Sequence, residues 1–138
     1  MSEVEHATVV DLGEVPVMFK RVGDDQAAIS QGWAEVEEAV GSLSGRKFYG
    51  VVDKASGEYR VCVHMREDDD PVDLGLEVGT IPGGRYARVR LNGDPPAVYE
   101  LIAPTFRRLA AHPDRDPSRP EIEFYRRHDV IDLLLPIT

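Results

Sequence analysis

Two glutamates and a tyrosine alternate near the C-terminal end of the chain, in a pattern that could place carboxylates beside a phenol. If this segment is a β-strand, Glu121, Glu123 and Tyr125 point to one of its faces. Ile122 and Phe124 point to the other face and can pack into a core. A carboxylate held among aromatic rings is partly desolvated, so it gains by meeting a cation and also holds a proton more tightly. Glu123 is therefore a candidate cation-binding group or general acid or base, and the alternative is an edge strand whose polar face is simply solvated.

The rest of the chain offers little further chemistry. Its 4 histidines lie in separate segments without the spacing of a metal site. The glycines of residues 79–84 lack the lysine and the spacing of a phosphate-binding loop. The acidic run at residues 67–70 lacks the spaced oxygen ligands and the glycine of a calcium loop, so a solvated connector is the expected structure. We therefore expect no metal and no cofactor.

Length and charge restrict the class of protein. A chain of 138 residues fits one domain, at residues 1–138, with a core of its own. The 16 basic residues against 25 acidic ones give a net charge of -9, which disfavours direct nucleic-acid binding because such binding depends on neutralising phosphates. The single cysteine, Cys62, forms no internal disulfide, and no apolar run approaches the ~20 residues of a membrane helix. The sequence predicts a cytoplasmic protein that does not bind membranes.

The first half of the chain predicts four strand segments and one amphipathic helix. The strand segments are residues 7–12, 15–22, 48–53 and 58–65. Asp24 and Asp25 can cap a helix that starts after the second segment. Ile29, Trp33 and Val36 then recur at helical spacing.

The second half repeats this order. Its strand segments are residues 74–81, 85–91, 121–125 and 130–135. Val98, Ile102 and Phe106 supply the apolar stripe of its helix, which Pro104 should kink or split. We therefore predict an α+β fold made of a duplicated strand-helix-strand-strand repeat, with repeat one at about residues 7–66 and repeat two at about residues 74–138. The sheets should be antiparallel, with helices on one side and a ligand cleft between the repeats.

Several short motifs occur in the same order as in a known family. They are Ile-Pro-Gly-Gly-Arg-Tyr-Ala at residues 81–87, Pro-Glu-Ile-Glu-Phe-Tyr at 120–125 and Leu-Pro-Ile at 135–137. Residues 15–23, residues 48–53 and the helix bearing Trp33 match the first repeat in the same way. With these motifs the chain resembles the GyrI-like small-molecule-binding family, which includes the effector-binding domains of multidrug-sensing transcription regulators. The resemblance covers nearly the whole chain and implies an SHS2-like duplicated fold and an aromatic cleft with a glutamate at its floor.

The resemblance also implies roles for particular residues. Glu123 matches the cleft glutamate, Tyr49 the aromatic residue at the start of the second strand, and Trp33 the helix aromatic that faces the cleft. Trp33 would equally fit a plain core position. Phe48 and Tyr49 alternate, so only one of them faces the groove, and the phenol favours Tyr49. The secondary ligand-binding candidates are Tyr86, Tyr99, Phe106 and Tyr125.

Arginines near one of these candidates depart from the family pattern. Arg85, Arg88 and Arg90 surround Tyr86, and a solvated strand face is their expected position. If one of them reached the groove instead, it could pair with Glu123 and weaken a preference for cations.

Three functions follow from these observations and the resemblance. The first is a free-standing protein that binds a small hydrophobic or cationic molecule, for sensing or sequestration. The second is a hydrolase of reactive or toxic small molecules, similar to enzymes of this family, with Glu123 as the catalytic residue. The third is an interaction protein resembling the gyrase inhibitors, with a protein partner that the sequence does not identify.

Overall fold

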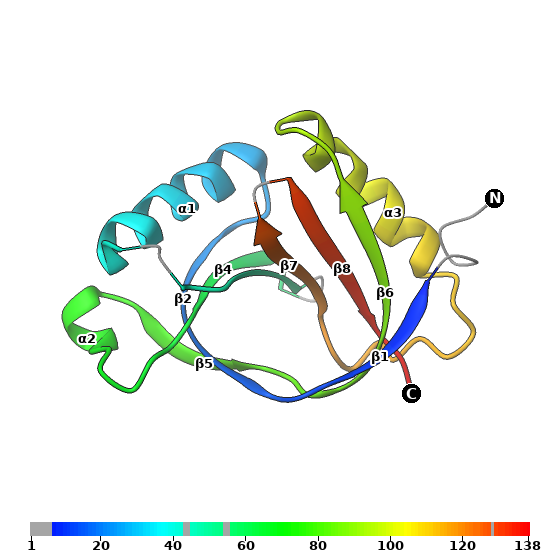
Figure 1. The fold of residues 1–138 in the computed structure, drawn as a ribbon, viewed down its shortest axis with the longest axis horizontal. Helices are drawn as coiled ribbons and strands as arrows, with labels where there is room; N and C mark the ends of the chain where they lie inside the picture. Colours follow the sequence, from blue (N-terminus) through cyan, green and yellow to red (C-terminus); the bar gives the residue numbers. More distant parts are fainter. Residues whose placement is uncertain (1–6, 43–44, 54–55, 128) are drawn as a thin grey trace.

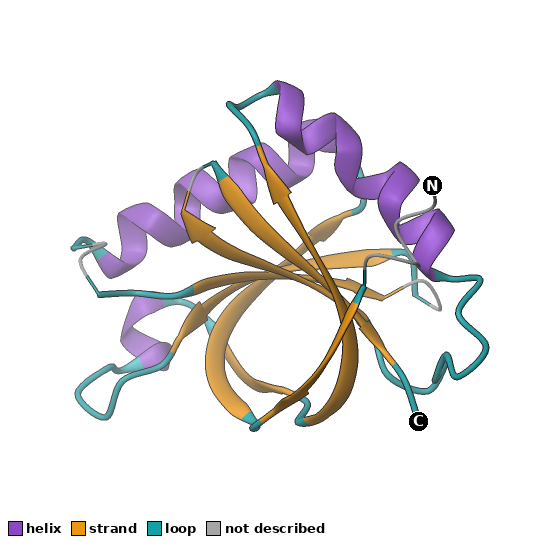
Figure 2. Ribbon diagram, turned by 45° about the vertical axis from the view of Figure 1, so that its right-hand side comes forward, coloured by secondary structure: helices purple, strands orange, loops and turns teal. Residues whose placement is uncertain are grey.

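The computed structural model describes residues 7–42, 45–53, 56–127 and 129–138. Within these residues, the protein is an α+β fold in which 8 antiparallel strands form one strongly curled sheet (Figure 1). The helices α1 and α3 lie on the same outer side of this sheet (Figures 1 and 2).

The first repeat contains two consecutive strands, a long helix and a hairpin. Its elements are β1 (Thr8–Leu12), β2 (Val15–Gly23), α1 (Gln26–Val40), β3 (Phe48–Asp53) and β4 (Glu58–His64). Asp25 caps α1 as predicted, because its carboxylate accepts a hydrogen bond from the Ala28 backbone N–H at 2.9 Å. The helix ends at Gly41, whose φ of 71° is readily adopted only by glycine.

The second repeat has the same order, with a short helix in front of it. Its elements are α2 (Pro71–Leu74), β5 (Glu77–Ile81), β6 (Gly84–Asn92), η2 (Ala97–Leu101), α3 (Ile102–Leu109), β7 (Glu121–Arg127) and β8 (Val130–Pro136). The second predicted helix is divided into the 3₁₀ turn η2 and the α-helix α3. This division agrees with Pro104, which has no N–H for an α-helical bond to the turn before it. The strand predicted to start at Leu74 begins only at β5, because Asp70 and Pro71 start α2 instead.

The sheet curls so strongly that each of its two edge strands, β1 and β5, continues along the chain into a strand at the opposite end of the sheet. The strand order is β1-β6-β8-β7-β3-β4-β2-β5. β1 pairs with β6 and β2 pairs with β5, without a shift of register: Leu12 lies opposite Gly84 and Val15 lies opposite Ile81. Because β1 and β2 are consecutive, as are β5 and β6, these pairs join the two ends of the sheet. The curled strands therefore have an inner face and an outer face (Figure 2).

Separate apolar clusters occupy the two faces. Between α1 and the outer face Met18, Val36 and Val61 are buried, and between α3 and the outer face a second set around Leu109 and Leu133 is buried. The inner face buries a third cluster, which contains Val17, Phe19, Tyr49, Val51, Cys62, Ile81, Tyr86, Ile122 and Leu134. Each fully buried large aliphatic side chain contributes about 1.5–3 kcal/mol to folding. None of the helices in the described part of the chain has the length and apolar character needed to span a membrane.

Candidate functional site

Glu123 lies in the middle of the sheet, on the outer face. Its strand, β7, runs between β3 and β8, and Glu123 is paired with Gly50 on one side and Leu133 on the other. Only 5% of the residue is exposed to solvent. A carboxylate so placed loses its hydration and must be satisfied by neighbouring protein groups.

Two tyrosine hydroxyls supply hydrogen bonds to this carboxylate. Tyr59 from β4 and Tyr125 from β7 each donate to the same oxygen, Oε1 of Glu123, at 2.6 Å. Hydrogen bonds to a charged acceptor are shorter and stronger than neutral ones. Tyr59 is itself 2% exposed, so this polar cluster is held inside the protein.

Further aromatic rings cover the cluster from the two helical segments. Trp33 of α1 meets the ring of Tyr125 edge-on, with ring centres 5.2 Å apart, and meets Phe48 at 5.9 Å. Tyr99 of η2 meets Tyr125 edge-on at 6.5 Å. We call Trp33, Phe48, Tyr59, Tyr99 and Tyr125 the aromatic cluster. Such edge-to-face pairs each contribute about 0.5–1.5 kcal/mol beyond their buried area.

Gly50 makes room for the carboxylate and the phenol that bonds to it. A Cβ atom at this position would overlap the Tyr59 hydroxyl and would lie 2.7 Å from Glu123 Oε1. We therefore expect Gly50→Ala to break the Tyr59–Glu123 hydrogen bond and to lower the free energy of unfolding by about 1–3 kcal/mol. Urea unfolding measures this. Gly13→Ala is the matched control, since a Cβ there meets nothing within 4 Å, and equal losses in both variants would contradict this role for Gly50.

Burial changes the proton affinity of the groups in this cluster. The pKa of Glu123 is raised because desolvation outweighs the hydrogen bonds from Tyr125 and Tyr59, and repulsion from Asp24 and Glu121 adds to it. Desolvation also raises the pKa of Tyr59 and of Tyr125, and the nearby Glu123 charge raises both further. Both phenols therefore stay protonated and keep donating to Glu123.

This raised pKa makes stability depend on pH. In the unfolded chain Glu123 titrates near its ordinary pKa of 4.5, whereas the folded protein holds the proton more tightly. Folding stability from this group is therefore highest below that value and falls as the pH rises through the folded pKa. Glu123→Gln should remove this dependence, so its stability relative to the wild type should increase between about pH 4 and about pH 8 in urea unfolding. A difference that stays constant over this range would contradict the raised pKa.

The structure places the other predicted site residues in several environments. Tyr125 bonds to Glu123, and Trp33 and Tyr99 contact the ring of Tyr125, so all three belong to the aromatic cluster. Tyr49 does not, because the pairing of Gly50 with Glu123 turns Gly50 and Phe48 to the outer face and Tyr49 to the inner one. Of the two neighbours, Phe48 and not Tyr49 therefore shares a face with Glu123.

Tyr86 and Phe106 are also away from Glu123. Tyr86 is fully buried in the inner cluster, where its hydroxyl donates to the Pro82 carbonyl at 2.6 Å. Phe106 is 5% exposed and packs with Leu109 in the core beneath α3. The structure therefore brings neither ring to Glu123.

The arginines around Tyr86 do not pair with Glu123. Arg90 forms a two-point ion pair with Asp132, with distances of 2.7 and 3.2 Å. Arg88 and Arg90 share the inner face with Leu134 and Asp132, their partners in β8, whereas Glu123 lies on the outer face. Among the described residues no basic side chain forms an ion pair with Glu123.

The sequence interpretation missed two members of the cluster, Tyr59 and Phe48. Tyr59 reaches Glu123 across β3, over the space that Gly50 leaves free. A glycine inside a predicted strand often marks a close approach of another group, so Gly50 was the available signal.

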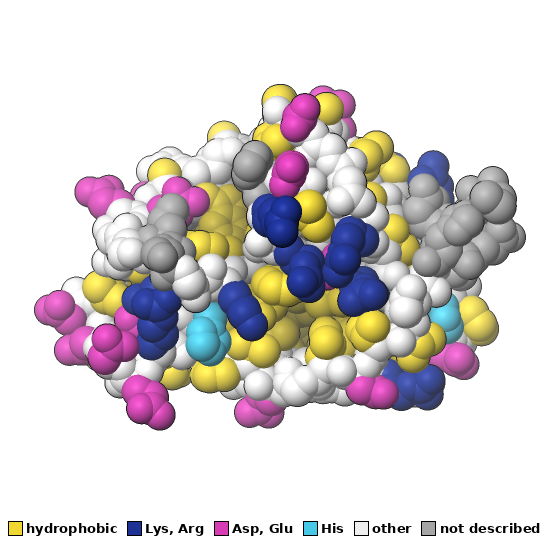
Figure 3. Space-filling view, in the orientation of Figure 1, with side chains coloured by type: hydrophobic (Ala, Val, Ile, Leu, Met, Phe, Trp, Pro, Cys, Tyr) yellow, Lys and Arg dark blue, Asp and Glu magenta, His cyan; other side chains and the backbone are white. Residues whose placement is uncertain are grey.

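Two surface cavities are present, and the second of them shares Tyr125 with the aromatic cluster. One, of about 370 Å³, opens on the inner face between β2, β4 and the loop before β7. The other, of about 310 Å³, is lined by Arg46, Lys47, Phe124, Tyr125, Arg126 and Arg127. Figure 3 shows basic side chains gathered at the centre of one face around an apolar hollow. Glu123 lines neither cavity, since the aromatic cluster covers it.

No metal site is found in the part of the chain that the structure describes. Nowhere there do three or more His, Cys, Asp or Glu side chains gather in a way that could hold a metal ion. The histidines at positions 6 and 128 lie outside the described residues.

A comparison with models of protein families identifies the family of the chain. A family model described as Cass2, integron-associated effector binding protein, matches residues 17–137. The chain belongs to this family. This match supports the predicted relation to effector-binding proteins. Membership of the GyrI-like family itself stays a prediction. A comparison with curated proteins gives no significant match.

Solved structures share the fold of this Cass2 family member at low sequence identity. An integron cassette protein from Vibrio cholerae, VCH_CASS2, is 14% identical, with a TM-score of 0.75 over 96% of this chain and 95% of that one. SAV2435, solved bound to tetraphenylphosphonium, is 14% identical, with a TM-score of 0.63 over 96% and 93%. A hydrolase from Listeria innocua is 10% identical, with a TM-score of 0.56 over 96% and 91%.

Proposed function

We propose that the protein is a small-molecule effector-binding protein that takes lipophilic cations at Glu123. The observation that carries this proposal is a buried carboxylate that accepts two phenol hydrogen bonds and lacks a basic partner among the described residues. A cation that reached Glu123 would supply the missing counter-charge. It would also stabilise the ionised carboxylate against the desolvation that now raises its pKa.

A second buried carboxylate, that of Asp132, is paired with basic side chains of the protein itself. Asp132 is 2% exposed and lies between Arg90 and Arg126, at 2.7 and 3.5 Å. Its charge is thus neutralised within the protein, as is usual for a buried acid. Glu123 is also buried, at 5% exposure, but its hydrogen-bond donors are neutral phenols and the nearby charged groups Asp24 and Glu121 are acids. This difference favours an external cation for Glu123.

The aromatic cluster provides the remainder of the proposed site. Its rings can stack on flat apolar groups, and each ring face that meets a cation contributes about 0.5–2 kcal/mol. Because Glu123 is 5% exposed, a ligand that contacts the carboxylate must displace part of this cover. Tyr99 is 40% exposed and contacts the rest of the cluster through the edge of Tyr125, so it is the ring most easily displaced.

The comparisons support a small-molecule ligand of this kind. The family is described as effector binding, and SAV2435 was solved with tetraphenylphosphonium, a lipophilic aromatic cation. A lipophilic aromatic cation would also suit the buried carboxylate and the aromatic rings around Glu123.

Titration with tetraphenylphosphonium tests the proposal. Trp33 is the single tryptophan of the chain and contacts Tyr125, which bonds to Glu123, so its emission should change on binding. We expect a saturable change with roughly micromolar affinity, about -8 kcal/mol. Triphenylmethane is the uncharged comparison and should bind more weakly. If the emission stays constant up to the solubility limit of a panel of aromatic cations, the proposal fails.

A hydrolase that uses Glu123 is the second candidate. The raised pKa of Glu123 favours it, since a carboxyl group that titrates closer to neutral pH is a better general acid or base. The structural similarity to a protein described as a hydrolase adds support. Turnover of a bound compound, lost in Glu123→Gln, would separate this function from binding alone.

A further inference from the structure

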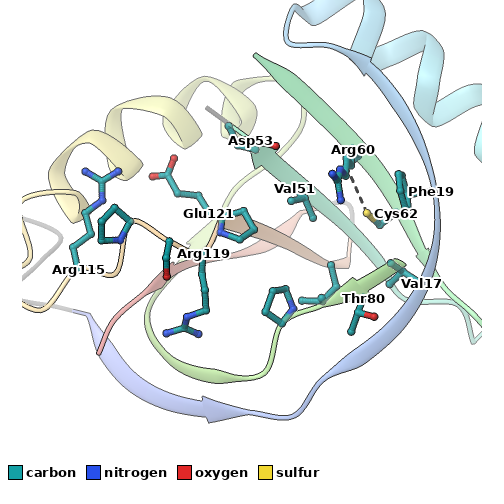
Figure 4. A pocket seen from close by; sticks show the side chains of 16 residues that line it. Val17, Phe19, Val51, Asp53, Arg60, Cys62, Thr80, Arg115, Arg119 and Glu121 are labelled. Atoms are coloured by element: carbon teal, nitrogen blue, oxygen red, sulfur yellow. Dashed lines mark hydrogen bonds between the residues drawn. The ribbon is translucent and has the colours of Figure 1, made fainter. Parts of the chain in front are cut away.

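A second site is suggested by the cavity on the inner face of the sheet. Its volume is about 370 Å³, within the range of small-ligand pockets. Val17 and Phe19 of β2 and Cys62 of β4 form an apolar wall (Figure 4). Ile81 of β5 also lines the cavity. The loop at residues 115–120 forms the opposite wall. These strand residues face away from Glu123, so the sheet separates this cavity from the aromatic cluster.

One charged side chain in the cavity has an unmet hydrogen-bonding requirement. Arg60 lines the cavity, and its guanidinium carbon lies 4.9 Å from the centre of the Phe19 ring. The Nε–H of Arg60 is buried and has no acceptor in the described structure. A buried donor without a partner is destabilising, and a ligand oxygen that accepted this hydrogen bond would remove the cost.

We propose that this cavity binds a small organic anion, a monocarboxylate with a short apolar body. The carboxylate would accept hydrogen bonds from the guanidinium of Arg60, whose planar fork of N–H groups matches two carboxylate oxygens. The apolar body would lie against the wall formed by Val17, Val51 and Ile81.

The charges around the cavity fit an anion. Three arginines line it, Arg60, Arg115 and Arg119, against two acids, Asp53 and Glu121. Both acids take part in other interactions, and Arg119 is ion-paired with Asp116 at 3.0 Å, so Arg60 and Arg115 are the basic groups offered to a ligand. The lining therefore has an excess of positive charge, although the chain as a whole has a net charge of -9.

The wall that would meet the apolar body carries no opposing charge. Cys62 is 1% exposed, and burial raises the pKa of its thiol to about 12. It therefore remains a neutral, weakly polar group near neutral pH. The cavity thus combines the guanidinium of Arg60 with an uncharged wall, which suits an amphipathic anion.

Octanoate and octan-1-ol are suitable probes, because they share an apolar chain and differ in charge. We expect octanoate to shift the methyl NMR signals of Val17, Val51 and Ile81 and to leave the Trp33 emission unchanged. Octan-1-ol should bind at least about tenfold more weakly, the loss expected when one charge-assisted contact is missing. Tetraphenylphosphonium should not compete with octanoate, so failure of the cation site would not affect this result.

Substitutions of Arg60 complete the test. Arg60→Gln should weaken octanoate binding by about tenfold or more, and Arg60→Lys, which keeps the charge but loses the planar fork, should weaken it by less than Arg60→Gln does. Arg21→Gln is the matched control, because Arg21 also lies over the Phe19 ring, at 5.8 Å, but does not line the cavity. The proposal is overturned if octanoate leaves these methyl signals unchanged at about 10 mM, or if octan-1-ol binds equally well. Unchanged octanoate affinity in Arg60→Gln would overturn it too.

Discussion

Glu123→Gln should weaken the binding of tetraphenylphosphonium by about 10- to 100-fold, which corresponds to about 1.4–2.8 kcal/mol. Glutamine keeps the size of the side chain and an oxygen that can accept from Tyr59 and Tyr125. The substitution therefore removes the charge with little other change. Isothermal titration calorimetry of both proteins measures the difference, and the affinity of an uncharged aromatic compound should change little.

A neighbouring acid provides the control for this experiment. Glu100 is exposed and follows Tyr99 directly in η2, so Glu100→Gln removes one negative charge near the aromatic cluster without reaching its interior. We expect its effect on cation affinity to be within about twofold, because exposed charges are screened. If the two variants lose affinity equally, the cation responds to the overall charge of this region and not to Glu123. If Glu123→Gln retains affinity but loses turnover of a substrate by about a hundredfold, the protein is a hydrolase.

Asp69→Ala should lower the free energy of unfolding by about 2 kcal/mol, an amount between those of exposed and deeply buried ion pairs. Asp69 accepts two hydrogen bonds from the guanidinium of Arg46, at 2.6 and 2.7 Å, and one from the Arg66 backbone N–H. The side chains of Arg46 and Asp69 are only 8% and 7% exposed. The variant would leave the Arg46 charge with little solvent and no counter-ion. Asp68→Ala, at the exposed neighbouring position, should cost much less.

The same ion pair predicts a pH dependence opposite to that of Glu123. Its hydrogen bond from Arg46 is the main reason that the pKa of Asp69 lies at about 2, below the ordinary 3.8. The stabilisation is therefore present above about pH 4 and is lost as the pH falls towards 2. The stability difference between wild type and Asp69→Ala should shrink over this range in urea unfolding. A difference that persists at the lowest pH would contradict the ion pair as its cause.

Local sequence patterns were sufficient to predict most elements of the fold. The alternation around Glu123 indicated a strand with one polar face, and β7 has that arrangement. Asp25 and the helical spacing of Ile29, Trp33 and Val36 indicated α1. These signals depend on contacts between residues a few positions apart, so a short segment contains all the information needed.

The acidic segment shows where such local reasoning failed. Residues 67–70 were expected to form a solvated connector, yet Asp69 is buried against Arg46 and Asp70 caps α2. Asp69 and Arg46 are 23 residues apart in the chain. No spacing rule joins positions at that separation, because the ion pair exists only once β3, β4 and the following loop have packed together.

The composition of the candidate site was decided by the register between strands. The sequence alone determined that Phe48 and Tyr49 point to opposite faces and that Glu121, Glu123 and Tyr125 share one. Only the tertiary structure decided that Gly50 pairs with Glu123, which places Phe48 beside Trp33 and turns Tyr49 to the inner face. A slip of one residue would exchange the two faces, and nothing in the local alternation of either strand distinguishes the two registers. The approach of Tyr59 to Glu123 over Gly50 has the same origin, because it requires three strands to be paired in one particular register.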